Sequence, residues 1–143
     1  MVYSARMNII INTDGGARGN PGPAAAGAVI RKDGVIVATV AQYLGERTNN
    51  WAEYEALILA LEEAHGTLGL ELAKAPVEIR MDSQLIVRQM EGRYKVKEPS
   101  LKEKYARVSD LISAYAPHAR FVHVPREENG DADKLVNQVL DAQ

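Results

Sequence analysis

The 143-residue sequence contains no cysteine. This absence excludes disulfide scaffolds, zinc–cysteine sites, thiol nucleophiles and iron–sulfur clusters. Long hydrophobic runs are also missing: the longest, residues 24–30 and 35–41, are much shorter than the roughly 20 apolar residues of a membrane-spanning helix. Residues 1–7 lack the apolar core of a signal peptide. We therefore expect a soluble, cytoplasmic protein with no membrane partner.

The sequence has no large excess of either charge, because 17 basic residues stand against 19 acidic ones and the net charge is −2. The charge of the whole chain therefore does not indicate a nucleic-acid partner. Residues 88–107, however, hold seven basic residues and only three acidic ones. Taken alone, this segment is more typical of a solvated helix face with ion pairs between successive turns than of a surface that binds a polyanion.

The length and the hydrophobic content of 46% fit one domain, since domains average roughly 150 residues. Short apolar runs bounded by turn residues predict strands at 7–13, 24–32, 35–43, 77–81 and 121–124. Apolar residues at helical spacing predict helices from Thr48 or Asn49 to about 65, from 83 to about 90, from Pro99 until Pro117 ends it, and from about 130. Glycine and proline make residues 14–23 a turn, and residues 66–75 are expected to form a loop.

The resulting order, β-β-β-α-β-α-α-β-α, predicts a single α/β domain with a five-stranded mixed sheet and helices on both faces. Asp33 and Gly34 favour a tight hairpin turn, so the first three strands are expected to form an antiparallel meander. We expect the domain to span residues 7–143 and residues 1–6 to form a flexible N-terminal extension.

Four acidic residues lie where predicted strands end or helices begin. Asp14 follows the first strand, Asp82 follows the fourth, and Glu53 and Asp133 fall in the first turns of the first and last helices. If the first and fourth strands are parallel neighbours, Asp14 and Asp82 emerge at the same sheet edge, where open α/β sheets place their ligands. Taken singly, each acid is equally typical of a turn or of a helix start, where the helix dipole favours negative charge.

Four carboxylates in one place would repel one another unless a counter-charge is present. An all-oxygen set without cysteine favours Mg²⁺ or Mn²⁺ over zinc. The reaction best matched to such a site is in-line phosphoryl displacement, in which two metal ions hold the attacking and leaving oxygens.

Four segments extend this pattern: TDGGARGNPGP at 13–23, TNNWAEYEAL at 48–57, MDSQLIV at 81–87 and ENGDADKL at 128–135. In order and spacing they resemble the signature segments of the type 1 ribonuclease H family, and the resemblance runs from about residue 7 to the C-terminus. It implies an endoribonuclease that cleaves the RNA strand of RNA/DNA hybrids without sequence specificity. It further implies two Mg²⁺ ions per site with substrate bound, Mn²⁺ as a substitute, and products with a 5′-phosphate and a 3′-hydroxyl.

The resemblance also implies roles for the four acids, which match the catalytic, metal-binding carboxylates of the family. Asp14 would bridge both ions, and Glu53 would contact a metal and a ribose 2′-hydroxyl beside the scissile phosphate. Asp82 would complete the site on the nucleophile side and Asp133 on the leaving-group side.

Further positions match substrate contacts of the family. The expected RNA contacts are the backbone at Gly15 and Gly16 with the side chains of Asn49 and Gln84. Asn20, Thr48 and Asn50 match contacts to the nucleic-acid backbone, with Thr48 and Asn20 in a phosphate pocket for the DNA strand. Any of these amides is alternatively a cap or a loop residue.

The sequence departs from the family pattern in two places. Many members carry a histidine in a loop before the last helix, whereas the connection VPREENGDAD at 124–133 has none. We interpret His123 as a residue of the fifth strand and propose Arg126 as the substitute, since arginine can reach a phosphate. Many bacterial members also insert a basic protrusion, which is reduced here to EGRYKVKEPS at 91–100. Given the resemblance, we favour a polyanion contact for its cluster of Arg93, Lys95 and Lys97 with Tyr94.

Several alternatives stay open. The fold could serve a binding module without activity, although all four carboxylates are present, or a metal nuclease of the wider superfamily that acts on DNA. Glu53, Asn49 and Gln84, as 2′-hydroxyl contacts, favour RNA. Trp51 is more typical of core packing than of stacking near a deoxyribose. We expect a monomer.

Overall fold

The computed structural model describes residues 8–143, and the extension expected at residues 1–6 lies outside them. The chain folds into five strands and five α-helices, in the order that the sequence predicts apart from one added short helix. The strands are β1 (Ile9–Ala17), β2 (Gly22–Lys32), β3 (Val35–Arg47), β4 (Val77–Met81) and β5 (Ala119–His123). The helices are α1 (Asn49–Leu68), α2 (Leu70–Lys74), α3 (Gln84–Met90), α4 (Pro99–Tyr115) and α5 (Gly130–Asp141), with a 3₁₀ turn η1 (Arg126–Asn129) before the last.

The strands form one mixed sheet in the order β3-β2-β1-β4-β5. The first three are an antiparallel meander, while β1 pairs with β4 and β4 with β5 in parallel. The central position of β1 explains its isoleucine-rich sequence, because Ile9 and Ile11 are fully buried. The predicted five-stranded mixed sheet and the parallel pairing of the first and fourth strands are confirmed.

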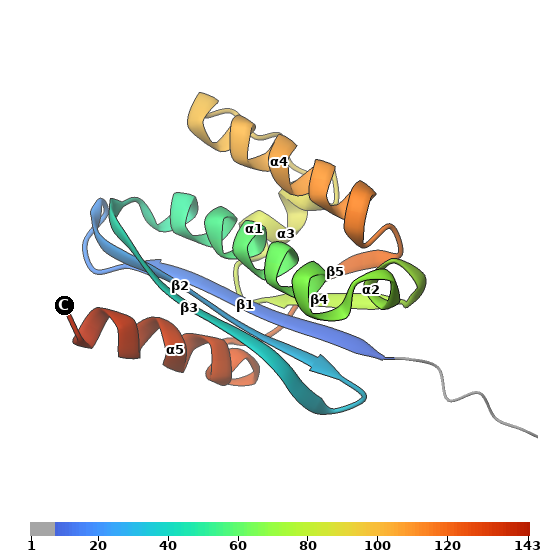
Figure 1. Ribbon diagram of the computed structural model, residues 1–143. Helices are drawn as coiled ribbons and strands as arrows, with labels where there is room; N and C mark the ends of the chain where they lie inside the picture. The colour runs from blue at the N-terminus through green and yellow to red at the C-terminus, as the bar shows by residue number, and fades with distance from the viewer. Residues whose placement is uncertain (1–7) are drawn as a thin grey trace, which may run out of the picture.

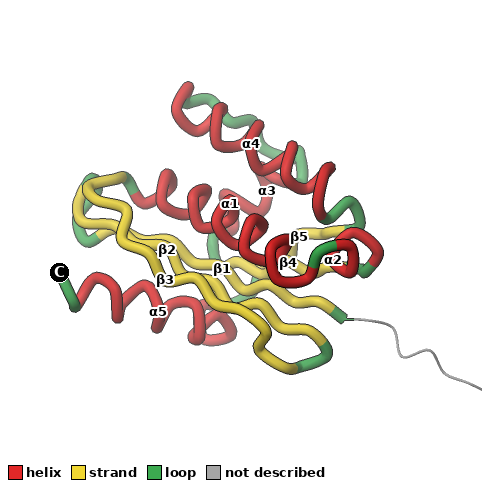
Figure 2. The backbone as a smooth tube through the Cα atoms, viewed as in Figure 1, coloured by secondary structure: helices red, strands yellow, loops and turns green. Residues whose placement is uncertain are grey.

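Helices cover both faces of the sheet, as predicted. Figures 1 and 2 show α1 to α4 on one face and α5 alone on the other. On the first face, Tyr54, Leu57 and Leu61 of α1 are buried in the main hydrophobic core. On the second face, Val136 and Leu140 of α5 form a smaller apolar cluster against β2.

Two boundaries correct the sequence predictions in the glycine-rich segment. β1 continues through Gly15 and Gly16 to Ala17, and β2 begins at Gly22, so the turn expected at 14–23 is confined to residues 18–21. Continuous antiparallel pairing, from Ile9 opposite Lys32 to Ala17 opposite Ala24, outweighs the low strand propensity of glycine here.

Other boundaries differ as well. α1 continues to Leu68, and residues 70–74 form helix α2 rather than a loop, because Leu72 is fully buried against the core. β3 extends four residues beyond the predicted end, to Arg47, and its pairing with β2 shifts register near Ala25 and near Arg31. β5 begins two residues early, at Ala119.

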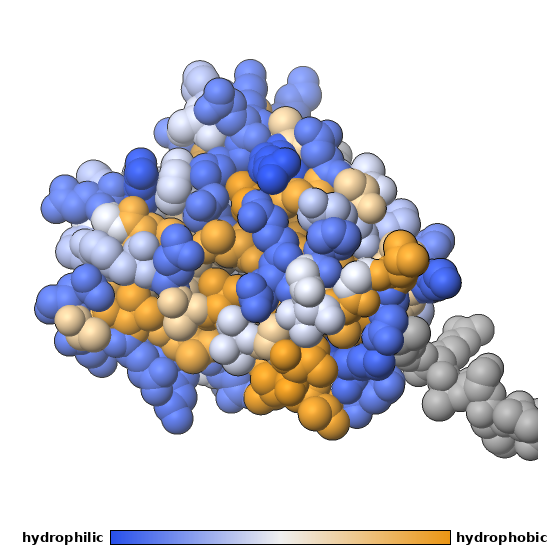
Figure 3. All heavy atoms as spheres, viewed as in Figure 1, coloured by the Kyte–Doolittle hydropathy of each residue, from blue (hydrophilic) through white to orange (hydrophobic). Residues whose placement is uncertain are grey.

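The surface in Figure 3 is largely hydrophilic, with an apolar patch along its lower edge, where the hairpin between β2 and β3 lies in Figure 1. Val35 and Ile36 at this hairpin are 65% and 52% exposed. The hairpin lies at the end of the sheet where β1 begins, since Ile9 pairs with Lys32. Among the described residues, none of the helices combines the length and apolar content that crossing a membrane requires.

Candidate active site

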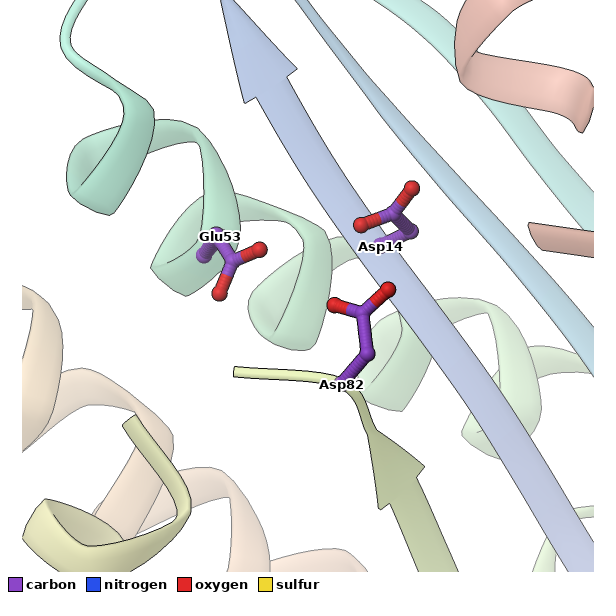
Figure 4. Close-up of side chains that lie close together, drawn as sticks. All are labelled: Asp14, Glu53 and Asp82. Carbon is purple, nitrogen blue, oxygen red and sulfur yellow. The ribbon is translucent and has the colours of Figure 1, made fainter. Parts of the chain in front are cut away.

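Three carboxylates meet above the end of the central strands. Asp14 comes from β1, Glu53 from the second turn of α1, and Asp82 from the residue that follows β4. Figure 4 shows the three side chains directed toward one another. Each offers one oxygen, and these three atoms all lie within 4.8 Å of one another. The structure therefore brings together three of the four acids that the sequence singled out.

The sheet and one glycine create this meeting point. Because β1 and β4 run in parallel, with Ile11 opposite Ile79, their carboxyl ends deliver Asp14 and Asp82 to the same edge. Glu53 reaches them because α1 packs directly on β1 at Gly15. A Cβ atom at Gly15 would lie 2.3 Å from the backbone of Ala52, the residue before Glu53. The absent side chain thus sets the distance between helix and strand.

Asp133 approaches from the opposite face of the sheet, on the first turns of α5. Its side chain is half-buried and lines the same cleft as the other three acids. Arg126 in η1 accompanies it, with Nη2 3.7 Å from Asp133 Oδ1. Gly27 permits the close packing of α5 on β2, since a Cβ atom there would lie 2.6 Å from the carbonyl oxygen of Ala132.

Burial and mutual repulsion raise the pKa values of these carboxyl groups above their ordinary range. Burial, followed by the charges of the neighbouring carboxylates, raises the pKa of Asp14 to about 8. Burial likewise raises the pKa of Glu53 to about 8, with a hydrogen bond to Ser83 acting in the opposite direction. The pKa of Asp82 is also raised by burial, against the lowering effect of the Arg126 charge. The site as it stands lacks sufficient positive charge for its acids.

The donor set fits hard divalent cations. Asp14 and Glu53 are only 8% and 6% exposed, yet Glu53 Oε2 has no hydrogen-bond partner among the described residues. A buried carboxylate oxygen without a donor is costly unless a cation or another ligand meets it. Oxygen ligands in this number are those that Mg²⁺ and Mn²⁺ prefer. The prediction of a metal site is therefore consistent with the geometry.

The carboxylates line the floor of an open cleft of about 480 Å³. Gly15, Gly16, Asn49 and Arg126, all predicted substrate contacts, line it together with the four acids. Residues of α5, namely Val136, Asn137 and Leu140, also line the cleft, as does Arg18, the residue that follows β1. A cleft with acids on its floor and a polar rim is suited to a phosphate-bearing chain held by cations.

Known proteins share both the sequence and the fold. Residues 12–139 match the family described as reverse transcriptase-like. Ribonuclease HI of Halobacterium salinarum is 43% identical over 129 residues, which is 90% of this chain and 62% of that protein. The structure of LC11-RNase H1, isolated from compost, is 55% identical with a TM-score of 0.89, and covers 94% of this chain and 96% of its own. The chain belongs to the type 1 ribonuclease H family. The family and the fold predicted from the sequence are thereby confirmed.

Some ribonuclease H relatives are much longer than this chain. The bifunctional protein Rv2228c of Mycobacterium tuberculosis is 41% identical over 138 residues, 95% of this chain but only 36% of that protein. The N-terminal RNase H domain of Rv2228c has a TM-score of 0.84 to this chain and is covered over 99% of its length. The chain therefore spans about a third of that relative. A second structure of LC11-RNase H1 is a complex with an RNA/DNA hybrid.

Several of the predicted substrate contacts hold the chain's own backbone in place. Asn49 Oδ1 accepts a hydrogen bond from the backbone N–H of Ala17 at 2.9 Å, and Asn20 Oδ1 accepts one from the N–H of Asn49 at 2.9 Å. Thr48 caps α1 by accepting a hydrogen bond from the N–H of Trp51. The cap and loop functions that the sequence left open are thus present. Within residues 8–143, the side-chain NH₂ groups of Asn49 and Asn20 donate to no other residue and are available to a ligand.

The other predicted contacts are placed differently. Gln84 is exposed at the start of α3 and Asn50 is half-buried at the start of α1, and neither lines the cleft. His123 is the last residue of β5, which confirms its assignment to a strand. Trp51 packs half-buried at the edge of the core, as favoured, and the charged groups of Arg47 and Lys104 lie 4.1 Å and 3.8 Å from its ring centre.

One supporting pair escaped the sequence analysis. Asn12 and Asn129 are both buried, and Asn12 Nδ2 donates to Asn129 Oδ1 at 3.1 Å. Asn129 Nδ2 in turn donates to the carbonyl oxygen of Thr13 at 2.9 Å, and hydrogen bonding from Asn129 acts to lower the pKa of Asp82. The only signal was a polar residue inside the isoleucine-rich strand. The pair joins β1, which carries Asp14, to the turn that precedes Asp133.

Proposed function

We propose that this protein is a metal-dependent endoribonuclease that hydrolyses the RNA strand of RNA/DNA hybrids without sequence specificity. The observation that carries the proposal is the cluster of three carboxylate oxygens within 4.8 Å, on the floor of a polar cleft, in a chain of the type 1 ribonuclease H family. The complex of LC11-RNase H1 with an RNA/DNA hybrid supports the choice of substrate.

Asp14, Glu53, Asp82 and Asp133 would hold two Mg²⁺ ions when substrate is bound, with Mn²⁺ as a substitute. When bound, such ions supply the charge that stabilises the attacking and leaving oxygens of an in-line displacement. Asp14 occupies the central strand between the other acids, a position suited to contacting both ions. The buried and unpartnered Glu53 Oε2 supports a ligand function for Glu53. Cleavage would leave a 5′-phosphate and a 3′-hydroxyl.

The chain itself would position the hybrid. The backbone at Gly15 and Gly16, which lines the cleft, would contact the RNA strand. The side chains of Glu53, Asn49 and Gln84 would recognise ribose 2′-hydroxyls, the feature that distinguishes RNA from DNA. Arg126, 78% exposed beside Asp133, can reach a phosphate from the rim and would serve in place of the absent loop histidine.

The second strand and the flanking duplex would be held further from the carboxylates. Asn20, Thr48 and Asn50 lie around the start of α1, where they would contact the DNA backbone. Lys95 and Lys97, with Arg93, lie in the connection between α3 and α4 and would contact phosphates at a distance from the cut. The monomeric, cytoplasmic state expected from the sequence stays a prediction.

Cleavage of an end-labelled RNA strand in a hybrid tests the proposal directly. We expect Mg²⁺-dependent cutting of the hybrid at many positions, loss of cutting with a chelator, and little or no cutting of single-stranded RNA, double-stranded RNA or double-stranded DNA. Asp14→Asn should lower the rate by about a thousandfold or more, because a metal site is worth several kcal/mol in the transition state. Asp110→Asn, which removes an exposed carboxylate of α4, is the matched control.

The outcomes separate the alternatives. A folded protein that binds the hybrid but cuts nothing with either metal would favour a binding module. Cutting of DNA strands in preference to the hybrid would favour a DNA nuclease on the same fold. An Asp14→Asn variant that retains full activity would contradict the assignment of the site.

A further inference from the structure

The cleft continues well beyond the carboxylates, along one face of α5. Asp133, Asn137 and Asp141 follow at intervals of four residues, so they lie on the same side of the helix. At a rise of about 1.5 Å per residue, Asn137 and Asp141 lie roughly 6 Å and 12 Å along the helix axis from Asp133. This end of the cleft contains one cation, Arg18, among the residues that line it.

Arg18 reaches across the cleft to this helix face. Its Nη2 donates to Asp141 Oδ1 at 2.6 Å and to Asn137 Oδ1 at 3.2 Å. Asn137 is itself held by a hydrogen bond from its amide to the carbonyl oxygen of Asp133, at 3.1 Å. Among residues 8–143, only Nη2 of the Arg18 guanidinium donates hydrogen bonds, so Nη1 and Nε remain available as donors.

The backbone that carries Arg18 is closely constrained. Its N–H donates to the carbonyl oxygen of Pro23 at 2.9 Å, which closes the turn between β1 and β2. A Cβ atom at Gly22 would lie 2.2 Å from the carbonyl oxygen of Arg18, so the turn packs against itself. The base of the side chain is therefore fixed relative to Asp14, which lies four residues earlier, on β1.

The ion pair between Arg18 and Asp141 is exposed, because the two side chains are 48% and 68% accessible. Exposed pairs of this kind contribute about 0–1 kcal/mol. A guanidinium group also binds phosphate in a two-pronged geometry and is less strongly hydrated than an ammonium group. A phosphate in the cleft can therefore replace Asp141 as the partner of Arg18 at small cost.

We propose that Arg18 binds a phosphate of the cleaved RNA strand a few nucleotides from the scissile bond, and that Asp141 competes with this phosphate for the guanidinium group. The strand is assigned as the cleaved one because Arg18 and the carboxylates line one continuous cleft. This inference rests on the proposed function, since it takes an RNA/DNA hybrid as the ligand. It adds a binding position on the α5 side of the cleft, made by a residue other than those proposed above at the start of α1 and in the α3–α4 connection.

The test measures binding of a fluorescent RNA/DNA hybrid in the uncleaving Asp14→Asn background with Mg²⁺, by anisotropy between 50 and 200 mM salt. We expect Arg18→Gln to weaken binding roughly tenfold at low salt, as for loss of a charged hydrogen bond. The slope of log K against log salt should fall in magnitude by about 0.9, the value for one phosphate contact on a duplex. Arg18→Lys, which keeps the charge, should restore most of the slope.

Asp141→Asn tests the competition. It should tighten binding about threefold, because the freed guanidinium no longer has to leave a carboxylate. In the Arg18→Gln background the same change should have no effect. Two controls remove one charge from pairs outside the cleft: Arg120→Gln, whose Nη2 lies 2.6 Å from Glu78 Oε1, and Asp131→Asn, whose partner is Arg31.

The phosphate itself can be located with hybrids that carry one uncharged methylphosphonate linkage at successive positions of the RNA strand. One position should weaken binding with Arg18 present and have no effect with Arg18→Gln. The inference is overturned if Arg18→Gln changes the salt slope no more than Arg120→Gln, or if Asp141→Asn tightens binding equally without Arg18. Absence of any hybrid binding by the parent protein would overturn the proposed function as well, so the two failures are distinguishable.

Discussion

Asn129 carries no charge, yet it links three parts of the site. It accepts from Asn12, donates to the Thr13 carbonyl, and begins the turn of chain that delivers Asp133. A buried amide in this position both satisfies the backbone beside Asp14 and holds α5 at its working distance. Because it is 1% exposed, water cannot replace these hydrogen bonds when the side chain is removed.

We expect Asn129→Ala to lower the free energy of unfolding by about 1–3 kcal/mol, the cost of leaving buried polar partners unsatisfied. Mg²⁺ binding should weaken as well, because Asp82 and Asp133 lose a fixed neighbour. Urea denaturation and calorimetric Mg²⁺ titration measure the two effects. Gln138→Ala, an exposed amide on the same helix, should change neither. Equal stability of the two variants would show that the hydrogen bonds of Asn129 do not stabilise the fold.

Among the individual residues of the site, the sequence analysis identified the acidic residues but missed the buried asparagine pair. Asp14, Glu53 and Asp82 are recognisable because each stands at the end of an element and within a family motif. Asn12 and Asn129 lie 117 positions apart, and neither has a partner of complementary charge to suggest their contact. A hydrogen bond between two neutral side chains depends on tertiary packing that local pattern does not encode.

Packing of α1 on β1 depends on Gly15, the residue that follows Asp14. We expect Gly15→Ala to destabilise the fold by about 3 kcal/mol, since its Cβ atom would lie 2.3 Å from the Ala52 backbone and force the helix away. Displacing α1 moves Glu53 with it, so hybrid cleavage should fall more than 100-fold. Gly16→Ala is the matched control for stability, because its Cβ atom meets nothing closer than 3.7 Å. Thermal unfolding compares the two variants, initial cleavage rates compare Gly15→Ala with the parent, and equal losses of stability in the two variants would contradict this account.

The boundaries of helices and strands could be predicted where the spacing of apolar residues in the sequence matches their burial in the structure. The strand at 77–81 and the start of the helix at Pro99 have the predicted boundaries, because each is bounded by proline or by a polar turn. Prediction failed at Gly15 and Gly16, where ladder pairing outweighs local propensity, and at α2, which is short and is held by the burial of Leu72. Both errors concern segments whose conformation is set by distant neighbours.

Over the whole molecule, the distribution of charge governs binding more than its sum. To bind a hybrid, a chain of net charge −2 has to attract a polyanion into a cleft lined by carboxylates, which repel it. Divalent cations on its floor, Arg126 and Arg18 at its rim, and the basic residues between α3 and α4 would supply the attraction. The same carboxylates couple folding to pH, because the pKa values of Asp14 and Glu53 lie near 8 in the folded chain and near 4 when unfolded.

Between about pH 4 and 8 the metal-free folded chain therefore holds protons that the unfolded chain releases, and its stability falls as the pH rises through this range. We expect the melting temperature in chelator to drop by about 5 °C or more between pH 5 and pH 8.5, since one pKa unit corresponds to about 1.4 kcal/mol. Asp14→Asn, which cannot ionise, should show a shallower decline. Mg²⁺ competes with the same protons, so it should raise the melting temperature more at pH 8.5 than at pH 6. If the melting temperature falls with pH equally in the parent and in Asp14→Asn, and if the Mg²⁺ effect does not depend on pH, these carboxylates ionise normally. Another group would then link folding to metal binding.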